Sequence, residues 1–182
     1  MPQALLLIDI QQDYFPGGEM ELVGIEQASH QAAKLLAWFR EQKMLVIHIQ
    51  HIFASAEAPF FKPDTAGIEI HSSVKPMASE MVITKQNVNS FQKTDLKLRL
   101  DALKIDELVI CGAMSHMCVE GTTRAASDLN YKCKVIHDAC ATGDQKFQDH
   151  TIPAQDVHGT AMATLGFAYA EVLSLDDWNK TN

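Results

Sequence analysis

The sequence has little cysteine, and none of it lies in closely spaced pairs. Only four cysteines occur among the 182 residues, and no two of them form a Cys-x-x-Cys pattern. A chain of this length can bury a core without covalent cross-links, so we expect the thiols to be reduced. Three of them (Cys111, Cys133 and Cys140) are predicted to be buried apolar residues, since free cysteine commonly takes that place.

Basic charge is also scarce, and long apolar runs are missing. Lysine and arginine total 15 against 23 aspartates and glutamates, giving a net charge of -8 without a basic stripe. This disfavours a nucleic-acid partner and favours a small-molecule substrate. Apolar runs such as 4–8 are too short to cross a membrane, and no basic segment precedes a secretory apolar region. We therefore expect a cytoplasmic protein without a membrane partner.

No internal repeat, low-complexity tract or linker divides the chain. Its length and its content of 47% hydrophobic and 21% charged residues predict one folded domain over 1–182. Residues 51–80 hold three prolines and little periodicity, which indicates a long loop or lid. Its Phe60 and Phe61 are candidates either to roof a pocket or to fill a subunit interface. The stretch 140–152 is predicted to be a second surface loop.

Apolar β-rich segments alternate with helical patterns along the chain. Strands are predicted at about 4–9, 44–50, 81–84, 107–113, 133–138 and 169–174, and helices at about 25–42, 95–103, 116–129 and 153–165. Runs such as LLLID and ELVICGA are typical of strands covered on both faces. The pattern predicts an α/β fold, a three-layer α/β/α sandwich with a mostly parallel, Rossmann-like doubly wound sheet.

Functional groups in open parallel sheets gather beyond the carboxyl ends of the strands. Four such positions carry candidate residues here: Asp9, His51, Lys85 and the segment after Ala113. That last segment, GAMSHMCVEGTTRAA at 112–126, follows an apolar strand and predicts a strand-turn-helix. With Ser115 as the helix cap, Cys118 would lie in the first turn, where free N–H groups favour a thiolate and bind an oxyanion.

Asp9 and Lys85 are the natural partners of such a nucleophile. Asp9 would accept the thiol proton, and Lys85 would keep Asp9 ionised and stabilise negative charge. Spacing alone leaves open that both residues are helix caps or solvated surface charges.

Three motifs together resemble the isochorismatase-like cysteine hydrolases over nearly the whole chain: DIQQDYFPGGEM at 9–20, TKQNVNSF at 84–91 and GAMSHMCVEGTTRAA. The resemblance implies that Asp9 is the general base, Lys85 its electrostatic partner and Cys118 the nucleophile that forms an acyl-enzyme. It also implies a cis peptide bond between Ala113 and Met114, with the N–H groups of Met114 and Cys118 as oxyanion hole. Relatives commonly form dimers or tetramers, so the resemblance implies a homo-oligomer.

Family members differ in substrate and in metal use. Those that hydrolyse nicotinamide carry an Asp-x-His motif and a further histidine that bind a metal, whereas this chain reads HIQHIF at 48–53. A cluster of His51, Asp64 and His71 is conceivable, but we expect no metal and no cofactor. Tyr14, His51 and His116 are the candidate substrate contacts. Each of them is also open to a purely structural role.

Three readings of the activity remain open at this point. The presence of Cys118 favours hydrolysis of an amide-type C–N bond over the vinyl ether of isochorismate. A non-catalytic oligomeric binding protein that retains the fold is the alternative from another functional class. A peroxide-sensing role for Cys118 is a third possibility, although no nearby second cysteine supports it.

Overall fold

A six-stranded parallel sheet forms the centre of the computed structural model, which describes residues 2–181. Its strand order is β3-β2-β1-β4-β5-β8. The strands are β1 (Gln3–Ile8), β2 (Leu45–His51), β3 (Met81–Lys85), β4 (Glu107–Ala113), β5 (Lys132–Ala141) and β8 (Glu171–Leu173). Because β1 pairs with both β2 and β4, the direction of winding reverses there, which confirms the predicted doubly wound α/β sandwich.

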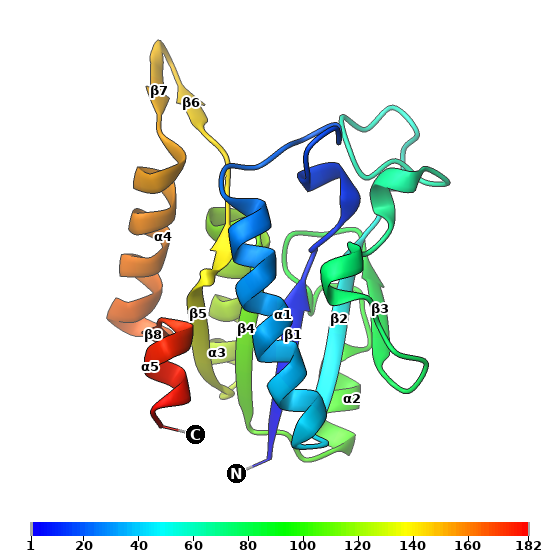
Figure 1. Ribbon diagram of the computed structural model, residues 1–182, viewed down its shortest axis with the longest axis vertical. Helices are drawn as coiled ribbons and strands as arrows, with labels where there is room; N and C mark the ends of the chain where they lie inside the picture. Colours follow the sequence, from blue (N-terminus) through cyan, green and yellow to red (C-terminus); the bar gives the residue numbers. More distant parts are fainter. Residues whose placement is uncertain (1, 182) are drawn as a thin grey trace.

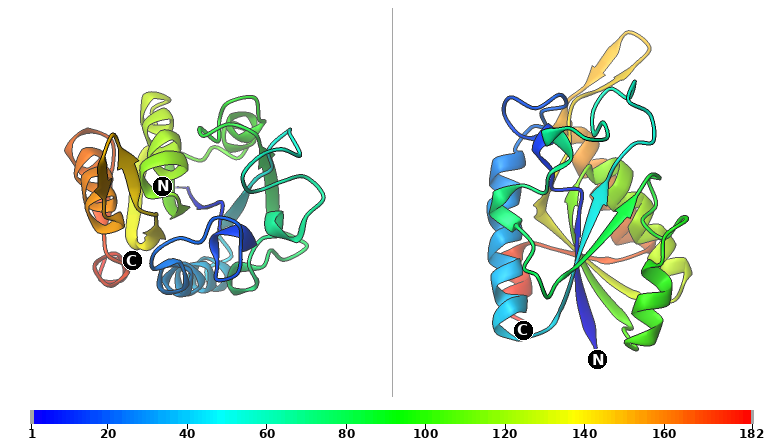
Figure 2. Two further views of the ribbon diagram at one scale, coloured as in Figure 1. Left: turned by 90° about the horizontal axis from the view of Figure 1, so that it is seen from above. Right: turned by 90° about the vertical axis from the view of Figure 1, so that its right-hand side faces the viewer.

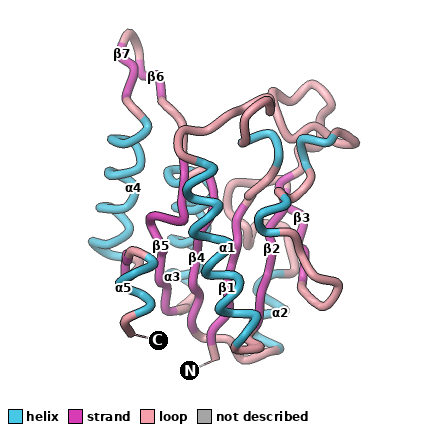
Figure 3. Tube along the Cα trace, viewed as in Figure 1, coloured by secondary structure: helices cyan, strands magenta, loops and turns pink. Residues whose placement is uncertain are grey.

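Helices cover both faces of this sheet (Figures 1 and 2). On one face lie α1 (Ile25–Glu41) and α5 (Leu175–Asn179); on the other lie α2 (Leu96–Ala102), α3 (Glu120–Asp128) and α4 (Ala154–Ala168). Short helical turns occur at Gln12–Tyr14, Ala66–Ile68, Ser72–Val74 and Ser115–Val119 (Figure 3). None of the helices in residues 2–181 is long and apolar enough to span a bilayer.

The apolar patterns of the sequence explain these layers. Every residue of β4 is buried, and so are all but the first of β1, because helices shield both sides of the sheet. Helix α1 buries residues at spacings of three and four, including Ala28, Ala32, Leu35 and Phe39, and leaves its charged side exposed.

The chain departs from the predicted pattern near its C-terminal end. Strand β5 continues to Ala141, and the predicted surface loop then forms a hairpin of β6 (Gln145–Phe147) and β7 (His150–Ile152) that projects from the body (Figure 1). The last predicted strand shrinks to the three residues of β8, and α5 follows it. These elements have three to five residues each, too few for a periodic signal.

Glycine at position 112 allows β1 and β4 to approach each other where the candidate site begins. Gly112 has φ of 128°, and a Cβ atom there would lie 2.0 Å from the carbonyl oxygen of Ile8. No other residue fits this contact, because the backbone conformation and the space both require the absence of a side chain. The close approach sets Asp9, which follows Ile8, beside the segment that leads from β4 to Cys118.

Candidate active site

Asp9, Lys85 and Cys118 meet at the carboxyl edge of the sheet, as the sequence predicts. The Nζ atom of Lys85 lies 2.7 Å from Oδ2 of Asp9 and 3.2 Å from Sγ of Cys118. The three residues are 0%, 2% and 4% exposed, in the order of Asp9, Lys85 and Cys118. Since Asp9 follows β1 and Lys85 ends β3, the lysine side chain reaches across the end of β2 to join them.

The Lys85 ammonium group is the centre of this arrangement. Besides Asp9 and Cys118, it contacts Nδ1 of His51 at 2.9 Å and donates to the carbonyl oxygen of Asn87 at 3.0 Å. An ammonium group has three N–H donors and no acceptor, so all four of these neighbours receive hydrogen bonds from it or share them. The cation is therefore fixed in position and its charge is directed at both Asp9 and Cys118.

Burial shapes the protonation of the three groups. It raises the pKa of Asp9, although the charge and hydrogen bond of Lys85 offset part of the rise. Burial and the charge of Asp9 raise the pKa of the Cys118 thiol, against the opposing effect of Lys85. Burial alone would lower the pKa of Lys85, but Asp9 and Cys118 outweigh it and raise the value. The resting site thus pairs one cation with one anion, and Cys118 remains a thiol beside the Asp9 carboxylate.

The segment that carries Cys118 differs from the predicted first turn of an α-helix. The peptide bond between Ala113 and Met114 is cis, and residues Ser115–Val119 form a π-helical turn before α3 begins. Ser115 does not cap this turn: its hydroxyl donates to the carbonyl oxygen of Ala141 and pairs with Nδ1 of His158 at 2.8 Å. The expectation of a resting thiolate at a helix terminus differs from the structure, because burial of the sulfur and the charge of Asp9 raise the pKa of the thiol.

His51 lies inside the site, where its imidazole ring contacts Lys85. Its Nδ1 atom accepts from Lys85, which places the ring proton on Nε2, and that nitrogen has no partner among the described residues. Burial and the charge of Lys85 lower its pKa to about 3, so the ring is neutral. His51 therefore holds Lys85 in place and leaves one N–H donor free.

Tyr14 and His116 occupy different surroundings. Tyr14 is buried in the turn after β1, and burial together with the nearby charges of Asp9 and Cys118 raises its pKa well above the usual value, so it keeps its hydroxyl proton. His116 is half-buried and its Nδ1 pairs with the Thr142 hydroxyl at 2.8 Å. Tyr14 is thus electrostatically coupled to the site, whereas the described contact of His116 links the π-helical turn to the end of β5.

An aromatic cover closes the site on the side of the long loop. It consists of Tyr14, Phe53, Phe60 and Phe61, with ring centroids of neighbouring members 4.6 to 5.7 Å apart. His51 packs against the same group, 4.4 Å from the ring of Phe53. The 51–80 segment, predicted to be a long loop or lid, thus supplies three of the four rings of the aromatic cover, and His51 connects them to Lys85.

Two buried polar residues that the sequence analysis did not identify hold the aromatic cover in place. Gln11 accepts from the backbone N–H of His51 and donates to the carbonyl oxygens of His51 and Ile68. The Asp13 carboxylate accepts from the N–H of Phe61 at 2.6 Å. Both belong to the DIQQD motif, and their place directly after the first strand was a signal that they face the site rather than solvent.

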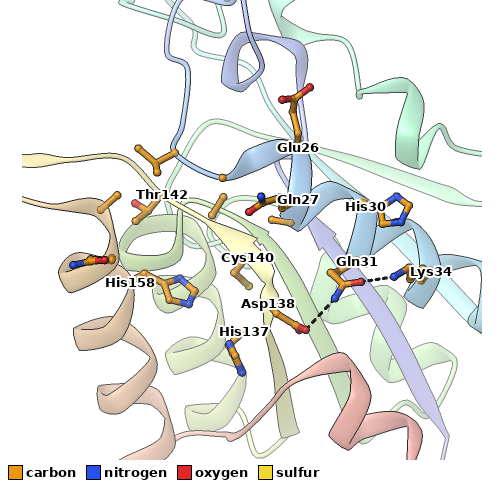
Figure 4. A pocket seen from close by; sticks show the side chains of 16 residues that line it. Glu26, Gln27, His30, Gln31, Lys34, His137, Asp138, Cys140, Thr142 and His158 are labelled. Carbon is orange, nitrogen blue, oxygen red and sulfur yellow. Dashed lines mark hydrogen bonds between the residues drawn. The ribbon is translucent and has the colours of Figure 1, made fainter.

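A cavity of about 860 Å³ lies away from the three central residues, between α1, the end of β5 and the start of α4 (Figure 4). His158 lines it, and the same ring reaches Ser115 in the π-helical turn. None of Asp9, Lys85 and Cys118 borders this cavity. Its polar lining is held by internal contacts, such as Gln31 to Asp138 at 3.2 Å.

The arrangement does not fit a metal centre. Among residues 2–181, the one group of potential ligands close enough to share an ion is Asp9, His51 and Cys118. The Lys85 ammonium group already contacts all three, so a cation would have to displace a buried cation that they hold. The alternative cluster of His51, Asp64 and His71 does not form; the ring of His71 instead stacks on Phe15.

Comparison with known proteins gives one consistent result. A family model described as the isochorismatase domain matches residues 3–165. The chain is 47% identical to the isochorismatase family protein YddQ of Bacillus subtilis, covering 99% of this chain and 100% of that protein. A solved structure described as an isochorismatase hydrolase from Oleispira antarctica superposes with a TM-score of 0.94 at 52% identity, covering 97% of this chain and 95% of that one.

Relatives with named reactions are more distant. The streptothricin hydrolase of Streptomyces noursei is 35% identical over 93% of this chain, which spans only 58% of that enzyme. The maleamate amidohydrolase of Pseudomonas putida is 30% identical over 85% of this chain and 78% of its own length. Both names describe hydrolysis.

Proposed function

Because the chain belongs to the isochorismatase family, we propose that it is a cysteine-dependent hydrolase that cleaves an amide-type C–N bond of a small molecule. The observation that carries this proposal is the buried contact of one lysine with both a carboxylate and a thiol, at 2.7 and 3.2 Å. A nucleophile, a base and a fixed cation are the parts that acyl transfer through a thioester requires.

The reaction begins with a neutral thiol. Asp9 takes the proton of Cys118 as the sulfur attacks the substrate carbonyl carbon, and the C=O electron pair moves onto oxygen. The N–H groups of Met114 and Cys118 stabilise this oxyanion in our mechanism, while Lys85 stabilises the negative charge that passes between Asp9 and the sulfur. Asp9, now protonated, gives the proton to the nitrogen of the leaving group.

The second half of the reaction restores the enzyme. Ammonia or an amine departs and leaves a thioester on Cys118. Asp9 then deprotonates a water molecule that attacks the thioester carbonyl carbon, and the C–S bond breaks as the carboxylic acid product forms. The proton returns from Asp9 to the sulfur. The same carboxylate thus serves as base and acid in both half-reactions.

The surroundings of the site favour a small substrate with a hydrogen-bond acceptor. The hydroxyl of Tyr14 and the free Nε2–H of His51 are the two donors that we assign to substrate binding, and His116 is retained as a third contact. The aromatic cover must move aside to admit the substrate, because Cys118 is only 4% exposed. Closure over the bound substrate then excludes bulk water until the acyl-enzyme has formed.

A panel of small primary amides, N-carbamoyl compounds and lactams tests the proposal through release of ammonia, amine or acid. Cys118→Ala should abolish turnover, and acid quenching of the wild type during turnover should yield a mass increase on the peptide that contains Cys118. Cys140→Ser is the matched control, since Cys140 is also buried but its sulfur contacts backbone groups of Ile136 and Gly112.

Two results would contradict this function. Hydrolysis that survives in Cys118→Ala would show that Asp9 and Lys85 act alone, as in cleavage of a vinyl ether. Tight binding of panel compounds without turnover by the wild type would instead favour the non-catalytic binding protein.

A further inference from the structure

The cavity between α1, the end of β5 and the start of α4, here called the α1–α4 cavity, borders the segments that hold the π-helical turn of Cys118 (Figure 4). Its volume of about 860 Å³ lies in the range of pockets that enclose a small molecule. Since Asp9, Lys85 and Cys118 do not line it, the cavity is separate from the site to which we assign hydrolysis. A ligand bound there would be a second one, in addition to the substrate.

Three residues of the cavity wall contact consecutive residues of the π-helical turn. His158 of α4 lies 2.8 Å from Oγ of Ser115 through its Nδ1. The Ser115 hydroxyl also donates to the carbonyl oxygen of Ala141 at 3.2 Å. The hydroxyl of Thr142 lies 2.8 Å from Nδ1 of His116. A ligand in the cavity would thus touch the residues that fix the turn two and three positions before the nucleophile.

His158 presents a free hydrogen-bond acceptor to the cavity. The Ser115 hydroxyl has one proton, which it donates to the carbonyl oxygen of Ala141, so Nδ1 of His158 carries the ring proton. Burial and, to a lesser extent, the charge of His137 lower the pKa of His158, which keeps the ring neutral. Its Nε2 is then a bare acceptor without a hydrogen bond to any of residues 2–181. Figure 4 shows the ring pointing from α4 toward β5, so a ligand with an N–H or O–H donor would satisfy it.

The charges of the cavity wall favour a cation. Two carboxylates, Glu26 and Asp138, line the cavity, and Lys34 is the only ammonium group among its lining residues. The Lys34 ammonium group donates to Oε1 of Gln31 at 2.9 Å, as Figure 4 shows. Asp138 accepts from Nε2 of Gln31 at 3.2 Å and from the N–H of Leu175 at 2.9 Å, which leaves each of its oxygens a second lone pair. The wall therefore offers acceptors and a surplus of negative charge.

We propose that the α1–α4 cavity binds a small organic amine in its ammonium form, and that the bound amine stabilises the turn that carries Cys118. The ammonium group donates to Nε2 of His158, while the carboxylates of Glu26 and Asp138 balance its charge. The apolar part of the amine packs against the small aliphatic side chains of the wall: Val23, Ala28, Ala141 and Ala154.

The effect on the turn follows from the tautomer of His158. A donor bound at Nε2 requires the ring proton on Nδ1, and Nδ1–H then donates to the Ser115 hydroxyl. The amine thus binds the observed arrangement of the turn better than an arrangement in which Ser115 has moved away. Because a ligand shifts an equilibrium toward the state that it binds better, the amine reduces motion of the turn. Binding here does not depend on which bond Cys118 cleaves.

Titration calorimetry of the full chain with benzylammonium chloride tests the ligand class. Benzyltrimethylammonium keeps the ring and the charge but has no N–H donor, and benzyl alcohol keeps the ring and one donor without the charge. Each should bind about ten-fold more weakly than benzylammonium, or worse, because a hydrogen bond to a charged donor is lost. Comparable binding of benzyltrimethylammonium or benzyl alcohol, or no binding of benzylammonium at millimolar concentration, overturns the proposal.

Two substitutions locate the bound amine. His158→Asn places an amide near the position of Nδ1 and nothing at Nε2, so it should weaken benzylammonium binding about ten-fold or more. Glu26→Gln removes an exposed carboxylate and should weaken binding about three-fold. The matched controls His150→Asn on the hairpin and Glu41→Gln at the other end of α1 should bind like the wild type. Undiminished binding by folded His158→Asn would place the amine elsewhere and refute this site.

Hydrogen exchange, measured by mass spectrometry, tests the effect on the turn without a substrate. Saturating benzylammonium should slow amide exchange in the peptide that covers 114–119 by about five-fold, and leave the peptide of α2 unchanged. His158→Gln keeps an acceptor near the position of Nε2 but loses the contact with Ser115, so it should bind the amine without slowing exchange in the turn. Unchanged exchange in the wild type, or equal slowing in His158→Gln, would refute the coupling. Neither measurement requires turnover, so both outcomes are independent of the hydrolase test.

Discussion

Removal of the Lys85 charge is the perturbation with the clearest expected size. Lys85→Met keeps the length of the side chain and deletes an ammonium group 2.7 Å from a carboxylate, both of them fully buried. At that distance and an effective dielectric constant near 20, the lost attraction is about 6 kcal/mol, and the relieved desolvation of the lysine returns part of it. We expect a net loss of about 3–5 kcal/mol in the free energy of unfolding at pH 8.

The loss should shrink in acid, and its sign follows from proton linkage. Without Lys85, burial raises the pKa of Asp9 in the folded state above its value in the unfolded chain. The folded state then binds the extra proton, so stability is greatest below the unfolded pKa and falls as the pH rises toward the folded pKa. Because Lys85 offsets only part of the rise in the wild type, the variant should lose about 1.4 kcal/mol per pH unit relative to the wild type between the two folded-state pKa values of Asp9, that of the wild type and the higher one of the variant.

Urea unfolding, followed by the fluorescence of Trp38 and the buried Trp178, measures both effects without a substrate. The matched control is the double variant Asp9→Asn with Lys85→Met, in which neither charge remains. Asparagine suits position 9 because φ there is 52°, a conformation that asparagine tolerates. The double variant should be more stable than Lys85→Met alone by about 2 kcal/mol or more. The single variant Asp9→Asn completes the comparison. If the double variant loses as much stability as Asp9→Asn and Lys85→Met together, or if Lys85→Met unfolds like the wild type at pH 8, the two charges do not stabilise each other.

Three further changes should have measurable effects on unfolding. Gly112→Ala should lower the free energy of unfolding by about 3 kcal/mol, because the added methyl group would meet the Ile8 carbonyl oxygen in a backbone with positive φ. Gly143→Ala is the control and should change the free energy of unfolding little, since the nearest atom to an added Cβ is 3.5 Å away. Gln11→Leu should lower the free energy of unfolding by about 3 kcal/mol, because buried backbone groups of His51 and Ile68 lose their hydrogen-bond partner. A variant as stable as the wild type would show that Gln11 does not hold this segment in place. Glu80 has a pKa of about 2, because hydrogen bonds from Arg40, Met77 and His48 outweigh the effect of its burial. The lowered pKa stabilises the folded state above pH 4.5, and this stabilisation is lost as the pH falls toward 2. Glu80→Gln should therefore lower the free energy of unfolding more at pH 7 than at pH 2.

The fold was predictable because its signals are long and regular. Strands β1, β2, β4 and β5 and helices α1 and α4 each carry several buried apolar residues, and strand ends locate the site. Strand ends made Asp9, Lys85 and the segment that contains Cys118 candidates, and the resemblance of three motifs to a known family assigned their roles. The sequence alone also indicated that the 51–80 segment is irregular.

What could not be predicted depends on contacts between distant segments. Ser115 resembles a helix cap by position, but His158, 43 residues later, and Ala141 engage its hydroxyl instead. His51 ends a strand, but its sequence position does not indicate that its Nδ1 accepts from Lys85, 34 residues away. The sequence favoured a thiolate at Cys118 from its helix end and from Lys85, whereas burial of the sulfur and the charge of Asp9 raise the pKa of the thiol.

That protonation changes how the reactivity of Cys118 should be understood. A helix end acting alone would give a permanently activated thiolate, open to any electrophile. In this site the thiol is closed off and its pKa is raised, while Asp9 lies within hydrogen-bonding reach and Lys85 contacts both. In the mechanism that we propose, the proton leaves the sulfur only when a substrate carbonyl accepts the developing charge beside the Met114 and Cys118 N–H groups. Slow alkylation of Cys118 by a small reagent is accordingly compatible with fast acyl transfer, because the base, the cation and the oxyanion donors act together only around a bound carbonyl.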